Sequence, residues 1–169
     1  METKKEYYTK KIKTITLQIR EPKATLNAKT ANSSRKSFEI AQAIYKNLEP
    51  DQEHFSVLFL NSQNKMTGYK TLFSGAMSSS IVDSKIVFRN ALLFGATAII
   101  LIHNHPSGNS KPSSEDKIIT EDIIEIGVVL KLSVLDHIIL ADGTNDYFSF
   151  ADEGLIKRYT DNIKILREH

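Results

Sequence analysis

Residues 97–116 read TAIILIHNHPSGNSKPSSED, and this stretch decides the fold. Its first six residues are rich in β-branched side chains and carry no charge, which is typical of a central strand covered on both faces. Residues 106–112 contain Gly, Asn, Ser and two prolines, so they form a loop. Ser113 or Ser114 then caps a helix that we expect to run to about residue 132. The stretch thus predicts a strand, a loop and a helix in succession.

Two hairpins are predicted on either side of this stretch. Residues 54–60 (HFSVLFL) are apolar and aromatic, and a polar cluster at 61–64 separates them from a second strand at 66–73. Residues 134–140 form another strand, with a hairpin partner at 147–150 across an Ala-Asp-Gly turn. Together with the central strand, these segments predict one sheet.

Two further helices precede the central strand. Apolar residues three or four apart follow Ser34 and stop before Pro50, which predicts one helix. The other begins at Asp83 or Ser84 and ends at Gly95. The sequence therefore predicts an α/β fold, in which helices flank a mixed β-sheet.

The chain divides into three parts. Residues 1–32 form an N-terminal extension with a short strand at 15–19, residues 33–156 form the domain, and residues 157–169 form a tail. The tail is amphipathic at best, so we expect it to fray. A length of 169 residues suits one core rather than two.

Composition limits the chemistry and the location of the protein. The chain has no cysteine, which excludes disulfides, thiolate metal sites and a cysteine nucleophile. The N-terminus lacks the apolar segment of a secretory signal, and the longest nearly apolar run, residues 91–102, is too short to span a membrane. We therefore expect a cytoplasmic protein whose metal ligands, if any, are His, Asp or Glu.

Charge gives little support for nucleic-acid binding. The net charge is +2, from 22 basic and 20 acidic residues. Lysines do gather before the domain, at Lys4, Lys5, Lys10, Lys11 and Lys13. We interpret this run as a solvated tail, and a basic arm that contacts DNA phosphates is the alternative.

The chemistry-bearing residues follow the central strand. His103 and His105 are two apart on an extended chain, so both imidazoles point to the same side. The loop that follows brings the chain back toward the two histidines, with Asp116 in the first turn of the next helix, where it can serve as a third ligand. A His pair alone can also be two hydrogen-bonded surface residues, but two His and one Asp suit zinc and leave a fourth position for water.

A zinc site of this kind can catalyse hydrolysis, because zinc lowers the pKa of a bound water to roughly 7. A carboxylate outside the ligand set must then accept the water's proton. Glu53 is the candidate, since it precedes the strand at 54–60, which we expect to pair near the His-bearing strand. Ser113 is placed either to hydrogen-bond a developing oxyanion or to cap the helix.

The strings HNHPSG at 103–108 and PSSED at 112–116 resemble the signature of the bacterial RadC family. They also fit the wider JAMM (MPN+) pattern, which is H-x-H-P, six residues, then S-x-x-D. Similar supporting stretches are SVLFLN at 56–61, LDHII at 135–139 and SFADEG at 149–154. The resemblance implies a JAMM/MPN+ domain, related in fold to cytidine deaminases, over residues 33–156.

The resemblance also implies roles for individual residues. His103, His105 and Asp116 become the Zn²⁺ ligands, and Ser113 becomes the oxyanion partner. Glu53 matches the catalytic glutamate if Ser56 replaces the glycine of the family pattern. Rival glutamates are Glu49 and Glu115, and His137 is expected to be a core histidine or one that supports a ligand.

The sequence differs from related families at two points, and the resemblance implies two alternative functions. Asn104 stands where eukaryotic deubiquitinases of this class have Ser or Thr, and the chain has no room for the helix-hairpin-helix DNA-binding region of longer RadC proteins. The first function is a zinc metallopeptidase or isopeptidase acting on a peptide or protein. The alternative is a metal-stabilised module without turnover, associated with DNA repair or a partner protein. An exposed sheet edge also allows a homo-oligomer.

Overall fold

A computed structural model describes residues 30–49, 51–75 and 82–167. The elements in chain order are α1 (Ser34–Tyr45), β1 (His54–Leu60), β2 (Met66–Ser74), α2 (Ser84–Leu93), β3 (Ala98–His105), α3 (Ser114–Leu130), β4 (Ser133–Ala141), β5 (Tyr147–Ser149) and α4 (Leu155–Arg167). The strand predicted at residues 15–19 and the lysine run lie outside the described residues, so both stay predictions.

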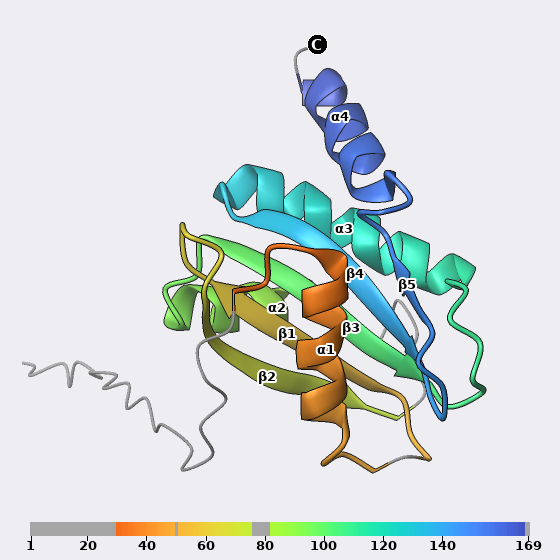
Figure 1. Cartoon of the computed structure of the whole chain (residues 1–169). Helices are drawn as coiled ribbons and strands as arrows, with labels where there is room; N and C mark the ends of the chain where they lie inside the picture. The colour runs from red at the N-terminus through yellow and green to blue at the C-terminus, as the bar shows by residue number, and fades with distance from the viewer. Residues whose placement is uncertain (1–29, 50, 76–81, 168–169) are drawn as a thin grey trace, which may run out of the picture.

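The five strands form one mixed sheet in the order β2-β1-β3-β4-β5 (Figure 1). The pairs β1–β2 and β4–β5 are antiparallel, which confirms the two predicted hairpins. The strand β3 pairs antiparallel with β1 and parallel with β4, and α3 makes the crossover that a parallel pair requires. The residues predicted as the central strand therefore lie at the centre of the sheet.

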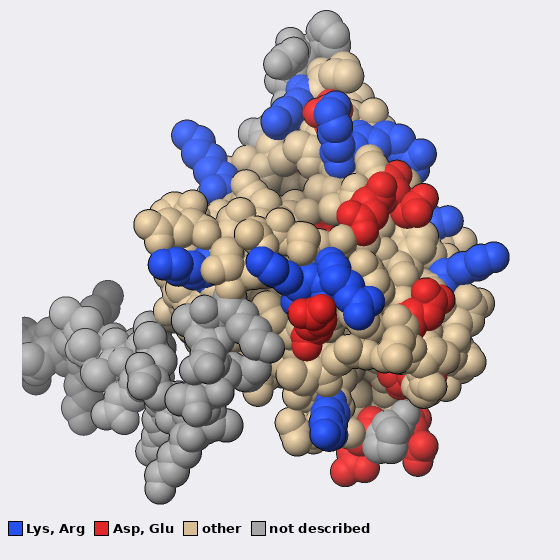
Figure 2. Space-filling view, viewed as in Figure 1, with Lys and Arg blue, Asp and Glu red and all other residues tan. Residues whose placement is uncertain are grey.

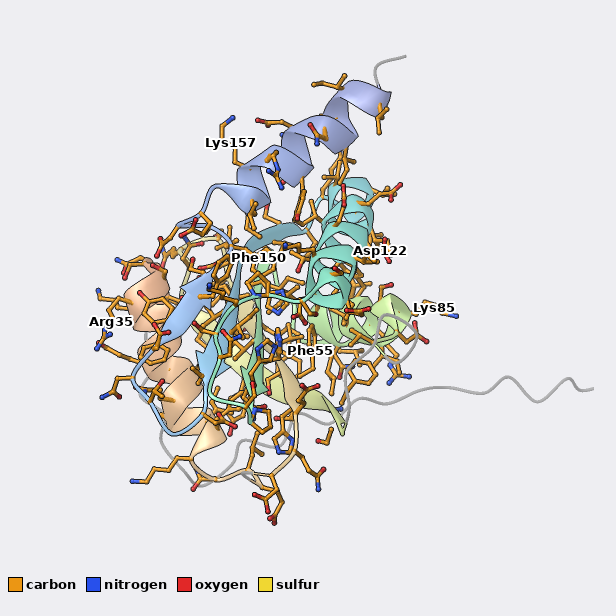
Figure 3. All side chains as sticks on the ribbon, turned by 90° about the vertical axis from the view of Figure 1, so that its right-hand side faces the viewer. Arg35, Phe55, Lys85, Asp122, Phe150 and Lys157 are labelled. Carbon is orange, nitrogen blue, oxygen red and sulfur yellow. The ribbon has the colours of Figure 1, made fainter. Side chains whose placement is uncertain are left out.

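Helices cover both faces of this sheet, as Figure 3 shows with α1 on one side and α2 and α3 on the other. Successive side chains of β3 alternate between these layers, because a strand has a period of two. Ile99 and Leu101 join the core under α2 and α3, whereas Ile100 and Ile102 join the core under α1. This double burial accounts for the uninterrupted apolar run in the sequence.

The strand β3 is longer than predicted. The sequence placed the buried strand at residues 97–102 and both histidines on the extended chain that follows it, and the pairing with β4 continues to His105 opposite Ala141. Local sequence could not reveal this pairing, because a parallel partner strand supplies it. His103 and His105 are therefore part of the strand and are held by the sheet.

The C-terminal segment also differs from the expected frayed tail. Residues Leu155–Arg167 form α4, which packs on α3 and projects beyond the sheet in Figure 1. Ile156, Tyr159 and Ile163 are buried in the core under α3. The amphipathic pattern that looked marginal in the sequence therefore has a partner in the fold. No helix among the described residues has both the length and the apolar character needed to cross a membrane.

Candidate metal centre

Three predicted ligands meet at the carboxyl end of β3. The Nε2 atoms of His103 and His105 are 2.9 Å apart. The carboxylate of Asp116, in the first turn of α3, lies 3.1 Å from His103 Nε2 and 3.5 Å from His105 Nε2. His103 and Asp116 are buried, and His105 is partly exposed. The three side chains are placed to bind one metal ion.

The donor set fits a divalent cation. His105 Nδ1 lies 2.6 Å from the carbonyl oxygen of Asn109. Since a carbonyl oxygen only accepts, Nδ1 carries a proton, and in the neutral ring Nε2 presents its lone pair toward Asp116. A lone pair and a carboxylate that face one another repel unless a proton or a cation lies between them. The chemistry of the site therefore calls for a positive charge at this point.

Asp116 is held in its ligating orientation by the cap of α3. Its Oδ2 accepts from both the backbone N–H and the hydroxyl of Ser113, each at 2.7 Å. Ser113 Oγ in turn accepts from the backbone N–H of Asp116 at 3.1 Å, which completes a capping box. Ser113 is thus the helix cap that the sequence offered as one of two roles, and its oxyanion role stays a prediction.

The electrostatics keep Asp116 ionised. Burial alone would raise the pKa of this carboxyl, but its contacts with the imidazoles of His103 and His105 and its hydrogen bond from Ser113 hold the pKa well below its usual range. The contact with Asp116 also raises the pKa of His105, in opposition to burial, and the charge of Glu53 adds to the rise. Asp116 thus supplies a negative charge that can balance a cation.

Glu53 lies beside the ligands. Phe55 pairs with His103 across β1 and β3, and Glu53 precedes Phe55 by two residues, on the segment that leads into β1. The charge of Glu53 contributes to the raised pKa of His105. The catalytic role of Glu53 stays a prediction.

The two rival glutamates lie elsewhere. Glu49 lines a cavity of about 370 Å³ on the α1 side of the sheet, together with Tyr45 and His54. Its carbonyl oxygen is 2.8 Å from His54 Nε2. Glu115 is exposed on α3. Of the three glutamates, Glu53 is the one whose charge is among the main causes of the raised pKa of His105.

Asn104 is a structural residue of the site that sequence reasoning treated only as a departure from a family pattern. Its side chain points to the opposite face from the two histidines. There its Oδ1 accepts from His54 N–H at 2.7 Å, and its Nδ2 donates to Gln52 O at 3.0 Å and to Asp142 Oδ2 at 2.6 Å. Asn104 thus holds the backbone on both sides of Glu53, and no spacing in the sequence signals it.

His137, on β4, contacts the ligand His103. This agrees with one of the two roles expected from the sequence, that of a histidine that supports a ligand. Its ring is fully buried, and its Nε2 lies 2.8 Å from His103 Nδ1. Burial, and after it the charge of His103, lower the pKa of His137. No pattern in the sequence indicates its other partner, Thr120, whose Oγ1 is 2.7 Å from His137 Nδ1.

Comparison with known proteins gives a consistent family. Residues 31–155 match the family model described as RadC-like JAB domain. A UPF0758 protein of Flavobacterium johnsoniae is 43% identical over 130 residues, which cover 77% of this chain and 55% of that protein. UPF0758 protein YfjY of Escherichia coli (strain K12) is 42% identical over 106 residues, which cover 63% of this chain and 65% of that protein.

A third relative, from Listeria welshimeri, is 44% identical over 103 residues, which cover 61% of this chain and 45% of that protein. This relative is UPF0758 protein lwe1562, and none of the three names states an activity. The chain spans about half the length of most of the curated relatives it matches.

Proposed function

Because the chain belongs to the family of RadC-like JAB domains, we propose that it is a zinc-dependent metallohydrolase, most simply a metallopeptidase or isopeptidase. The observation that carries the proposal is the convergence of His103, His105 and Asp116 on one point at the end of β3. Two imidazoles and one carboxylate are the ligands of several zinc hydrolases. A site of this kind needs no cysteine ligand, and the chain contains no cysteine.

The ion would be held by His103 Nε2, His105 Nε2 and the Asp116 carboxylate. When bound, zinc supplies Lewis acidity, which lowers the pKa of water and polarises a carbonyl group. The charge of Glu53 acts on His105, and in this proposal Glu53 accepts the proton of the attacking water and delivers it to the leaving group. Asn104 supports that role because it fixes the backbone before and after Glu53.

Ser113 is proposed to hydrogen-bond the developing oxyanion of the substrate. In the structure its hydroxyl donates to Asp116 Oδ2. Stabilisation of an oxyanion therefore requires the hydroxyl to turn away from Asp116 while the backbone N–H of Ser113 keeps the carboxylate in place. This double contact allows the hydroxyl to move without loss of the ligand orientation.

The experiment joins metal analysis with turnover. Purified protein is expected to contain about one zinc per chain by mass spectrometry of metals, and to cleave members of a peptide and isopeptide library. The substitution Glu53→Gln should abolish cleavage and keep the zinc, whereas His103→Ala should lose both. Glu49→Gln and Glu115→Gln are the matched controls, and both should cleave as the wild type does.

Two results contradict the proposal. One is the absence of stoichiometric zinc from protein that is purified without chelators. The other is cleavage that survives both His103→Ala and Glu53→Gln, because such activity would come from elsewhere in the molecule or from a contaminant.

The DNA-associated alternative stays a prediction, since its lysine-rich arm lies outside the described residues. On the face seen in Figure 2, basic side chains lie among acidic ones. Arg35 also pairs with Glu39 one helical turn away on α1, at 3.4 Å. Peptide substrates and assembly into a homo-oligomer are likewise proposals. Salt-dependent DNA binding that survives Glu53→Gln but is lost on removal of the first 13 residues would favour this alternative.

A further inference from the structure

A line of three hydrogen bonds runs from α3 through β4 to the ligand His103. Thr120 Oγ1 lies 2.5 Å from the carbonyl oxygen of Asp116, one helical turn earlier. His137 Nδ1 lies 2.7 Å from Thr120 Oγ1, and His137 Nε2 lies 2.8 Å from His103 Nδ1. All three side chains are buried, with at most 1% of their surface exposed. Solvent therefore has no part in these bonds.

Only one arrangement of protons satisfies this line. The carbonyl of Asp116 cannot donate, so the single hydroxyl proton of Thr120 points to it. The oxygen of Thr120 must then accept from His137 Nδ1–H. A neutral imidazole carries one N–H, so His137 Nε2 accepts from His103 Nδ1–H. This leaves the Nε2 lone pair of His103 directed at His105 and Asp116.

The ring of His137 is fixed between aromatic side chains. Phe150 stacks on it with centroids 4.9 Å apart, and Phe55 meets it edge-on at 5.8 Å. Figure 3 labels both phenylalanines, which belong to the core between the sheet and α3. The ring therefore cannot turn to exchange its two nitrogens without displacing the core.

We propose that Thr120 and His137 are positioning residues that fix His103 in its Nδ1–H tautomer and so present its Nε2 lone pair to the metal ion. The carbonyl of Asn109 fixes His105 in the same tautomer directly. His103 has no such direct carbonyl partner, and its partner His137 could either donate or accept. Thr120, two hydrogen bonds away from His103, determines which nitrogen of His137 carries the proton. The hydroxyl of Thr120 is itself oriented by the backbone carbonyl of Asp116, the residue that supplies the third ligand.

This device has a chemical consequence. Histidine ligands are often paired with a carboxylate, which adds negative charge to the site. The line through His137 and Thr120 is neutral, so it orients His103 without reducing the net positive charge around a bound divalent cation. The inference rests on the metal binding in the proposed function and is independent of hydrolysis.

The first test is the tautomer itself, read from nitrogen-15 NMR of the full chain without metal. The five histidines allow assignment by single substitutions. His137 should be protonated at Nδ1 and unprotonated at Nε2, and His103 should be protonated at Nδ1. A His103 that carries no proton at Nδ1 overturns the inference, whatever the protein does with metal.

The second test is Zn²⁺ affinity, measured by competition with a chromophoric chelator. Thr120→Val keeps the shape of the side chain and removes the hydroxyl, so it should weaken binding about tenfold, whereas Thr120→Ser should bind as the wild type does. His137→Phe should weaken binding about 10–100-fold, and His137→Gln, whose amide oxygen can accept from His103, should recover part of the loss.

The outcomes separate this inference from the proposed function. Equal Zn²⁺ affinity of Thr120→Val and Thr120→Ser, with both variants folded by circular dichroism, overturns the positioning role. A wild-type chain that binds no Zn²⁺ overturns the proposed metallohydrolase, and the NMR tautomer of His103 still decides whether Thr120 and His137 orient it.

Discussion

At the scale of single residues, Asn104 links the two faces of the sheet. Its neighbours His103 and His105 point to the metal centre, and its own side chain ties together Gln52, His54 and Asp142 on the other side. Asn104 is only 2% exposed and His54 only 5%, so the backbone N–H of His54 has a buried side chain as its partner. The segment that carries Glu53 is therefore anchored to the strand that carries the ligands.

Removal of this anchor should be costly. Asn104→Ala leaves the buried N–H of His54 and the carbonyl of Gln52 without their partner, and we expect a loss of about 2–4 kcal/mol in the free energy of unfolding. Urea denaturation measures it. Asn145→Ala, at an exposed asparagine, is the control and should change stability by less than about 0.5 kcal/mol. Equal stability of the two variants would show that Asn104 is not an anchor.

Asp136 is a buried carboxyl with an unusual titration. Burial raises its pKa to about 6, although it accepts hydrogen bonds from the backbone N–H groups of His137 and Ala151 and from the hydroxyl of Ser149. Because the pKa is higher in the folded state, the folded protein binds the proton more tightly. The contribution of Asp136 to stability is therefore largest at low pH and is lost as the pH rises from about 4 to about 6.

The variant Asp136→Asn isolates this effect, since all other groups titrate alike in both proteins. The free energy of unfolding of the wild type should fall by about 3 kcal/mol relative to that of the variant between pH 4 and pH 7. Urea denaturation at several pH values gives the difference. A difference that stays constant over this range contradicts the raised pKa.

At the scale of elements, α3 is both a structural layer and the carrier of the third ligand. Its first turn holds Asp116 through the capping box with Ser113. One turn later it holds Thr120, which contacts His137 on β4. The crossover that a parallel strand pair requires thus also brings a carboxylate to the end of β3.

The cap of α3 can be tested apart from any catalysis. Ser113→Ala removes the hydroxyl that accepts from Asp116 N–H, and we expect a loss of about 1 kcal/mol in the free energy of unfolding. Ser114→Ala, at the next exposed serine, should change stability far less. Chemical denaturation of the metal-free proteins compares them, and equal losses would mean that Ser113 does not cap the helix.

At the scale of the whole molecule, the metal centre is a product of strand order. The segment before β1 is distant in sequence from the end of β3 and the start of α3, but it lies near them because β1 pairs with β3. Ligands that come from two elements should couple metal binding to global stability, since the unfolded chain does not hold them together.

Added Zn²⁺ should therefore raise the melting temperature of the metal-free protein. At a free concentration of 100 times Kd the stabilisation is about 2.7 kcal/mol, or roughly 5–10 °C for a chain of this size. His105→Ala should show a much smaller rise, whereas Glu53→Gln should keep it, because Glu53 is outside the ligand set. Calorimetry measures the shift, and an equal rise in His105→Ala would place the ion elsewhere.

The sequence by itself determined the local elements and the ligand set. The apolar run before His103, the two hairpins and the cap at Ser113 are short-range patterns, and short-range patterns follow from backbone sterics and periodicity. The spacing of His103 and His105 was sufficient to place both rings on one side, since a strand alternates with a period of two. Asp116 followed because the loop between is short.

Only the tertiary structure decided the strand order, the full length of β3 and the packing of α4 on α3, because each depends on a partner far away in the chain. The same holds for the line from Thr120 through His137 to His103, which joins residues 17 and 34 positions apart. Such contacts leave no periodic signal, since a hydrogen bond between distant segments depends on where the fold places them. The sequence therefore determined which atoms can bind a metal ion, and the fold decided how one of them is oriented to do so.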